Sequence, residues 1–68
     1  MFYTVLEIQV DKNGSKACIP VIYDNYDDAV AKYFTICAAA AQSTIPYHAA
    51  HILRSDGIVT DGRVFEHK

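Results

Sequence analysis

The chain lacks tryptophan, has a single methionine, and contains no hydrophobic run long enough to cross a bilayer. A membrane-spanning helix needs about 20 consecutive apolar residues, so we expect no membrane partner. The N-terminus starts directly with an alternating pattern and shows no charged leader or cleavage site. Cysteines are also few, at two, whereas a small secreted domain usually needs several disulfide bridges. These absences favour a cytoplasmic protein.

An excess of basic charge is missing as well. Eight acidic residues against six basic ones give a net charge of −2, and neither sign forms a row along the chain. Nucleic-acid-binding proteins normally present a basic stripe to phosphate groups. The charge pattern therefore argues against nucleic acid as a partner.

Apolar residues, by contrast, are plentiful for a chain of this size. They make up 51% of 68 residues, which we interpret as a single domain covering residues 1–68. A chain this short is near the lower limit for building its own core, and one helix on a small sheet cannot hide so many apolar side chains. We expect some apolar surface to remain for a partner, most simply a second copy of the chain.

A β-hairpin is predicted at the start of the chain. Residues 2–11 alternate with period two, and Asn13-Gly14 is a strong signal for a two-residue type I′ turn. Such a turn places Val10 opposite Ala17. It directs one apolar set inward, namely Leu6, Ile8, Val10, Ala17, Ile19 and Val21. Pro20 has no N–H group to donate, so the second strand is predicted to form an edge of the sheet.

Residues 24–43 are predicted to form one amphipathic helix. At about 100° per residue, the apolar side chains gather on one face. That face comprises Tyr26, Ala29, Val30, Tyr33, Cys37, Ala40 and Ala41, with Phe34 and Ile36 at its margins. Either Asp24 or Asn25 can cap the N-terminus, and the Asp27-Asp28 pair suits the helix dipole. Pro46 lies just beyond the end and prevents continuation.

The C-terminal half is predicted to contain two further strands. Residues 47–54 and 58–66 flank Asp56-Gly57, a second hairpin signal, and Asp61-Gly62 interrupts the alternation in the way a β-bulge does. The pattern leaves open whether Ile52 or Leu53 points into the core. Taken together, the elements predict an α+β fold of type ββαββ. Its antiparallel sheet has the order 2-1-3-4, with the helix on one face.

Few residues are candidates for chemistry. His48 and His51 would converge on a helix but point to opposite faces of a strand, which argues against a metal site. Cys37 lies on the apolar helix face, where a thiol usually behaves as a small hydrophobic group. The aspartates near residue 24 are better explained as capping residues than as acid–base catalysts. We therefore expect no enzyme, no metal and no cofactor.

Two surfaces are more apolar than a solvated surface requires. The predicted outward face of the first hairpin carries Tyr3, Val5, Cys18, Pro20 and Ile22. The outer face of the helix is smooth along Ala31, Thr35 and Ala38. Either surface can bury against another protein chain, and these eight residues are the interface candidates.

A resemblance covers the centre of the chain. Lys32-Tyr33-Phe34-Thr35-Ile36, the alanines to Ala41, Ser43 and Ile45-Pro46-Tyr47-His48 together resemble a group of short, uncharacterised bacterial proteins. Some of these are associated with phage-like or mobile elements. The likeness extends to an acidic-aromatic end such as Phe65-Glu66-His67. The resemblance implies a small stand-alone protein and carries over no catalytic residue.

The leading hypothesis is a non-enzymatic interaction module that self-associates as a homodimer. An alternative is an inhibitor or adaptor of the phage or mobile-element type, which binds another protein through the sheet edge or the smooth helix face. A third hypothesis, a small enzyme or metal site that uses Cys37 or His48 and His51, has the geometry of the strand against it.

Overall fold

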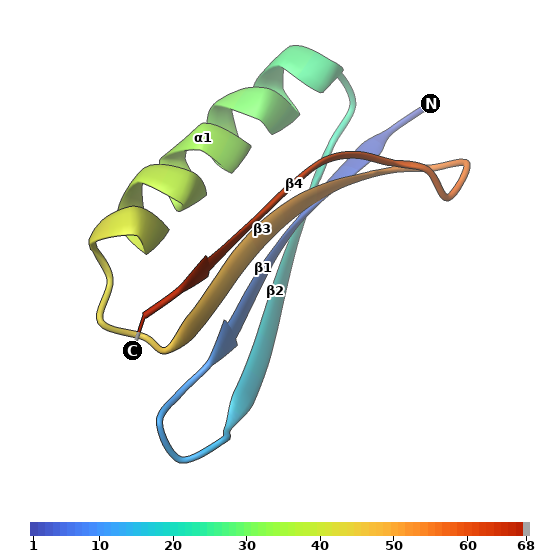
Figure 1. Ribbon diagram of the computed structural model, residues 1–68. Coiled ribbons are helices and arrows are strands. Elements are labelled where there is room, and N and C mark those ends of the chain that lie inside the picture. The colour runs from blue at the N-terminus through green and yellow to red at the C-terminus, as the bar shows by residue number, and fades with distance from the viewer. Residues whose placement is uncertain (68) are drawn as a thin grey trace.

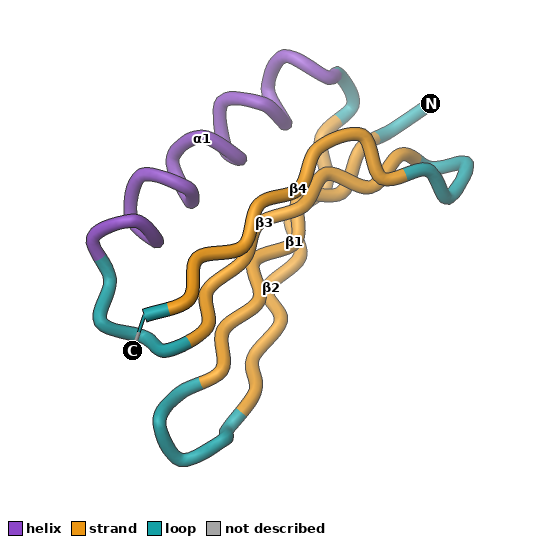
Figure 2. Tube along the Cα trace, in the orientation of Figure 1, coloured by secondary structure: helices purple, strands orange, loops and turns teal. Residues whose placement is uncertain are grey.

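The computed structural model describes residues 1–67 and contains the five predicted elements in the predicted order. They are β1 (Tyr3–Val10), β2 (Lys16–Tyr23), α1 (Tyr26–Gln42), β3 (Tyr47–Arg54) and β4 (Val59–Glu66). The strands form one antiparallel sheet in the order β2-β1-β3-β4. The helix lies across one face of this sheet (Figures 1 and 2). The predicted fold class and strand order are confirmed, and no helix within residues 1–67 is long and apolar enough to cross a membrane.

Helix α1 begins where a capping side chain stands. Asn25 is the N-cap: its side-chain oxygen accepts a hydrogen bond from the Asp28 backbone N–H at 2.9 Å. Asp27 and Asp28 occupy the first turn, where the helix dipole favours negative charge. At the other end, Ser43 is extended and its N–H donates to the Ala40 carbonyl. Of the two predicted caps, Asn25 is therefore the one used.

The hydrophobic core lies between α1 and the two central strands. Ala29, Tyr33, Ile36 and Ala40 are the buried positions of the helix, so the predicted apolar stripe is confirmed along its centre. Its edges differ from the prediction, because Tyr26, Phe34 and Ala41 are exposed. The sheet contributes Val5, Ala50 and Ile52, each fully buried. Ile52, rather than Leu53, thus points into the core.

The first turn differs from the predicted type I′ turn. Gly14 has a positive φ of 83°, but Asn13 does not. The hairpin is closed by a hydrogen bond from the Asp11 N–H to the Ser15 carbonyl, so its loop is longer than the predicted two residues. The Asp11 carboxylate explains the difference, since it accepts hydrogen bonds from the N–H groups of Asn13 and Ser15. Such a side-chain contact stabilises a turn of ordinary handedness followed by a left-handed glycine.

The longer loop shifts the register of the first hairpin by one residue. Val10 lies opposite Lys16, not Ala17, and Leu6 lies opposite Pro20. A shift of one residue exchanges the two faces of a strand. The predicted faces of β1 are therefore wrong: Val5 is buried under the helix, whereas Leu6 and Ile8 point away from it. The predicted sides of β2 hold, because Val21 pairs with Val5 on the helix side, but Ala17 and Ile19 on that same side are exposed and not part of the core.

The second hairpin follows the predicted course. Gly57 has a positive φ of 93° and its N–H donates to the Arg54 carbonyl, which closes the turn. Between Ile52 and Leu53 the register shifts, with Asp61 opposite Ile52 and Val59 opposite Leu53. The predicted irregularity is therefore present, one residue before the Asp61-Gly62 pair.

Candidate interaction surface

The side of the sheet turned away from α1 is mainly apolar. Because side chains alternate along each strand, the register places one set of residues on this side, which we call the open face. Its apolar members are Leu6, Ile8, Val10, Cys18, Pro20, Ile22, Ala49, Leu53, Val59 and Val64. Ile22 is 64% exposed and Val64 is 44% exposed. Within residues 1–67 no element covers the open face, as Figure 1 shows.

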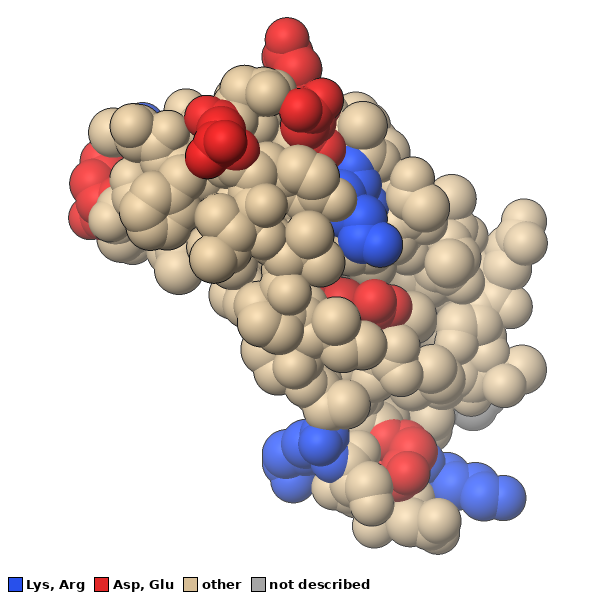
Figure 3. Space-filling view, turned by 180° about the vertical axis from the view of Figure 1, so that it is seen from behind, with Lys and Arg blue, Asp and Glu red and all other residues tan. Residues whose placement is uncertain are grey.

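Charge is confined to the margins of the open face. Of the described residues there, Lys16 and Glu66 lie at strand ends, and Thr4, Tyr47 and His51 are the other polar members. In a view of the whole molecule from behind, charged side chains stand in separate groups with uncharged surface between them (Figure 3). The centre of the open face therefore contains little that water would solvate strongly.

His51 lies flat against the backbone of the neighbouring strand. It pairs with Gly62, and a Cβ atom at that glycine would come within 2.6 Å of the His51 Nδ1 atom. The absence of a side chain at position 62 is what allows this close approach. Together with the fully buried Ala49, it keeps this part of the open face low and flat.

The predicted interface residues of the first hairpin divide into two groups. Cys18, Pro20 and Ile22 are exposed on the open face, as predicted. Tyr3 and Val5 are not on it: Val5 is fully buried and Tyr3 packs against the core, with its ring 5.4 Å from that of Tyr26. Those two predictions are wrong because the register differs by one residue.

Sequence reasoning missed most of the open face. It assigned Leu6, Ile8 and Val10 to the core, and it named neither Leu53 nor Val64 as an interface residue. A signal was present in the turn: Asp11 and Gly14 stand three residues apart, the spacing preferred at the first and last positions of a type I turn.

The outer face of α1 is exposed as predicted. Ala31, Thr35 and Ala38 are all solvent-accessible, and the Thr35 hydroxyl donates to the Ala31 carbonyl at 3.0 Å, which leaves this face without a free polar group in its middle. Phe34 adds an aromatic ring that is 62% exposed.

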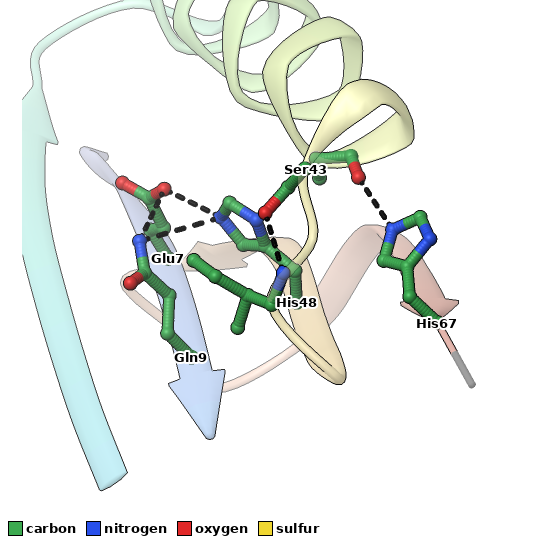
Figure 4. Close-up of polar contacts among 7 residues, drawn as sticks. Glu7, Gln9, Ser43, His48 and His67 are labelled. Carbon is green, nitrogen blue, oxygen red and sulfur yellow. Dashed lines mark hydrogen bonds and ion pairs between the residues drawn. The ribbon is translucent and has the colours of Figure 1, made fainter. Parts of the chain in front are cut away.

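A polar cluster lies on the helix side of the sheet, where no sequence pattern had indicated one. His48 is 3% exposed and donates from Nε2 to the Glu7 carboxylate at 2.7 Å (Figure 4). Gln9 donates to the same carboxylate oxygen at 3.1 Å. Burial raises the pKa of Glu7, but the hydrogen bonds from His48 and Gln9 and the nearby charge of Lys32 outweigh it and lower the pKa below 4.5. Glu7 is therefore held as a carboxylate.

The candidates for chemistry are dispersed. His48 and His51 point to opposite sides of the sheet, as predicted, and His67 donates from Nε2 to the Ala40 carbonyl. Among residues 1–67 no three possible ligands gather into a metal-binding group. Cys18 and Cys37 are both free thiols. A pocket between the first turn and the loop before β3 is lined by Asp11, Lys12, Thr44, Ile45 and Pro46, and contains none of these groups.

Comparison with known protein families, with curated proteins and with solved structures finds no match for this chain.

Proposed function

We propose that the protein is a non-enzymatic interaction module that acts in the cytoplasm as a homodimer, with the open face as its seam. The observation that carries this proposal is the apolar, uncovered side of the sheet. Monomeric proteins rarely leave apolar patches larger than a few hundred Å² in water. Burial of such a face against a second chain removes it from solvent at roughly 25 cal/mol per Å².

The size of the open face fits a dimer. Its four strands have eight residues each. At about 3.4 Å per residue and about 4.8 Å between strands, the face covers roughly 500 Å², which suits an interface at the lower end of the usual size range. The helix occupies one face of the sheet and leaves the other for a partner.

A second copy is the partner that this surface fits best. Two-fold symmetry brings the same patch of both chains together, so the patch must be complementary to itself. A flat, apolar surface with Lys16 and Glu66 only at its margins meets that condition, because no like charges are forced together at its centre. The fully buried Ala49 and the bare Gly62 add no protrusion.

Replacement of Ile22 by lysine tests the proposal, with Phe34→Lys as its matched control. The two side chains are equally exposed, at 64% and 62%, but Ile22 lies on the open face and Phe34 on the helix. At low micromolar concentration, sedimentation should give two chains for the wild type and for Phe34→Lys, and one folded chain for Ile22→Lys. A single chain for the wild type, or an intact Ile22→Lys dimer, would contradict the proposal.

A second candidate function is an adaptor or inhibitor that binds another protein through the outer face of α1. The exposed Ala31, Thr35 and Ala38 favour it, since small side chains allow a partner to approach the helix closely. The resemblance to proteins of phage-like elements is consistent with this role. If it is correct, Ala38→Glu loses a protein that the wild type captures, whereas Ile22→Lys retains it.

A further inference from the structure

The two edges of the sheet differ in their capacity to accept another strand. In β2, the hydrogen bond from Asp11 N–H to the Ser15 carbonyl sets which residues bond to β1. N–H groups of alternate residues point to the same side of a strand. The outward positions of β2 are therefore the even-numbered ones, and Pro20 stands in the middle of them. Without an N–H at that position, the β2 edge cannot continue the ladder.

The β4 edge has no such block. The N–H of His67 donates to the Pro46 carbonyl at 2.8 Å, so odd-numbered residues of this strand bond toward β3. Gly62, Val64 and Glu66 therefore direct their N–H and C=O groups away from the sheet. All three residues are exposed. They form an unprotected edge of the kind that pairs with another chain.

The two long flanks of α1 also differ in polarity. Tyr26 donates a hydrogen bond to Asp61, which places that flank of α1 over β4. Val30 and the exposed Phe34 follow Tyr26 by one and two helical turns, so they lie on the same flank. The opposite flank carries Lys32, whose charge acts on Glu7 in β1. The apolar flank and the open edge thus lie on the same side of the molecule.

We propose that β4 pairs antiparallel with β4 of a second copy, about a two-fold axis beside Val64, with the Phe34 flanks above the junction. The pairing is self-complementary. It sets Arg63 opposite Phe65 of the second copy, a cation and an aromatic ring that already contact each other within one chain at 5.1 Å. It also sets Asp61 opposite His67 of the second copy. This contact is independent of the open-face dimer. With the two axes crossing at right angles, both contacts together give a closed assembly of four copies.

The edge contact is expected to be the weaker of the two. Its hydrogen bonds replace bonds to water, so each contributes a small net gain, whereas the open face removes apolar surface from water. We therefore expect the edge contact only in concentrated solution. The open-face dimer should already be present in dilute solution.

Amide hydrogen exchange of Val64 tests the edge contact, with the Cys18 amide as its matched control. Both N–H groups point outward from edge strands, but only the β4 edge is proposed to pair. The measurement uses the Ile22→Lys variant, which removes the open-face contact, so that failure of one proposal is separable from failure of the other. Exchange at Val64 should slow about tenfold on concentration, with Cys18 unchanged. Equal, concentration-independent exchange at both amides would overturn the proposal.

Val64→Pro provides a second test. The substitution removes an N–H group that points away from β3, as Pro20 naturally does in β2. It also keeps an apolar side chain on the open face. Concentrated wild type and Val64→Thr should have the mass of four chains, and Val64→Pro the mass of two. Four chains for a folded Val64→Pro, or never more than two for the wild type, would overturn the edge contact. If Val64→Pro does not fold, the exchange experiment decides.

Discussion

The two faces of the sheet are both apolar, yet only one is covered. On the helix side, Val5 and Ile52 are fully buried, and they share that side with the polar residues Glu7 and His48. On the open face, Leu6 and Ile8 of β1 lie beside Pro20 and Cys18 of β2, and no ionic pair stands among them. The more uniformly apolar side of β1 is thus the one that its own helix leaves uncovered. This difference supports the proposal that a partner outside the chain covers the open face.

The polar cluster explains how the less apolar side of β1 can lie inside. A buried carboxylate is costly unless it is paired and hydrogen-bonded, and Glu7 receives hydrogen bonds from both His48 and Gln9. Held in this way, the Glu7 carboxylate lies partly buried beneath α1, although the buried His48 Nδ1 atom has no hydrogen-bond partner among residues 1–67. Among residues 1–67, the open face has no comparable set of mutually bonded residues, which is consistent with the proposal that another surface covers it.

The largest expected effect comes from a charge placed on each face in turn. Val5→Lys puts an unpaired charge into the core and should prevent folding, because the cost of several kcal/mol is comparable to the stability of a small domain. Leu6→Lys puts the same charge on the open face and should leave a folded single chain. Circular dichroism and sedimentation measure the two outcomes. A folded Val5→Lys variant would break the distinction between the faces.

A milder comparison uses adjacent residues of β3. Ile52 is fully buried on the helix side, and Leu53 lies on the open face. In the Ile22→Lys background, Ile52→Ala should lower the free energy of unfolding by about 2–5 kcal/mol, because it leaves a cavity. Leu53→Ala should lower it by about 1 kcal/mol or less, since its site is open to water without a partner. Urea unfolding measures both values, and equal losses would contradict the assignment of faces.

The smallest effect concerns the polar cluster. The pKa of Glu7 is lowered in the folded protein, so its charged form stabilises the fold at neutral pH, and that contribution is lost as the pH falls from 4.5 through the folded value. Glu7→Gln should cost about 1–2 kcal/mol at pH 7. The difference between wild type and variant should shrink toward zero in acid. Urea unfolding at a series of pH values measures this trend, and a constant difference would contradict it.

The fold was predictable because several local signals agree. Asn25 caps the helix, Pro46 ends it, Pro20 marks an edge strand and Asp56-Gly57 closes a hairpin, so the order of elements and strands follows. Each signal acts over a few residues and needs no knowledge of the rest of the chain.

The faces of β1 were not predictable in the same way. Alternation shows that a strand has two faces, but both faces of β1 contain apolar residues, so hydrophobicity favoured Leu6 and Ile8 for the core. The decision depends on the first turn and on the partner of Glu7. His48 is 41 residues away in the chain, and no periodic pattern relates two residues at that separation. The open face was therefore identified only in part, through Cys18, Pro20 and Ile22.

The most direct test of the account is the reactivity of Cys18 toward a thiol reagent, in a Cys37→Ser background that leaves one thiol. Cys18 is exposed in the single chain and lies on the open face, opposite Ile8. If a second copy covers the open face, labelling is slow at micromolar concentration and fast both on dilution and in the Ile22→Lys variant. Fast labelling of the undiluted protein, at the rate of the variant, would show that the open face is uncovered and would contradict the central claim.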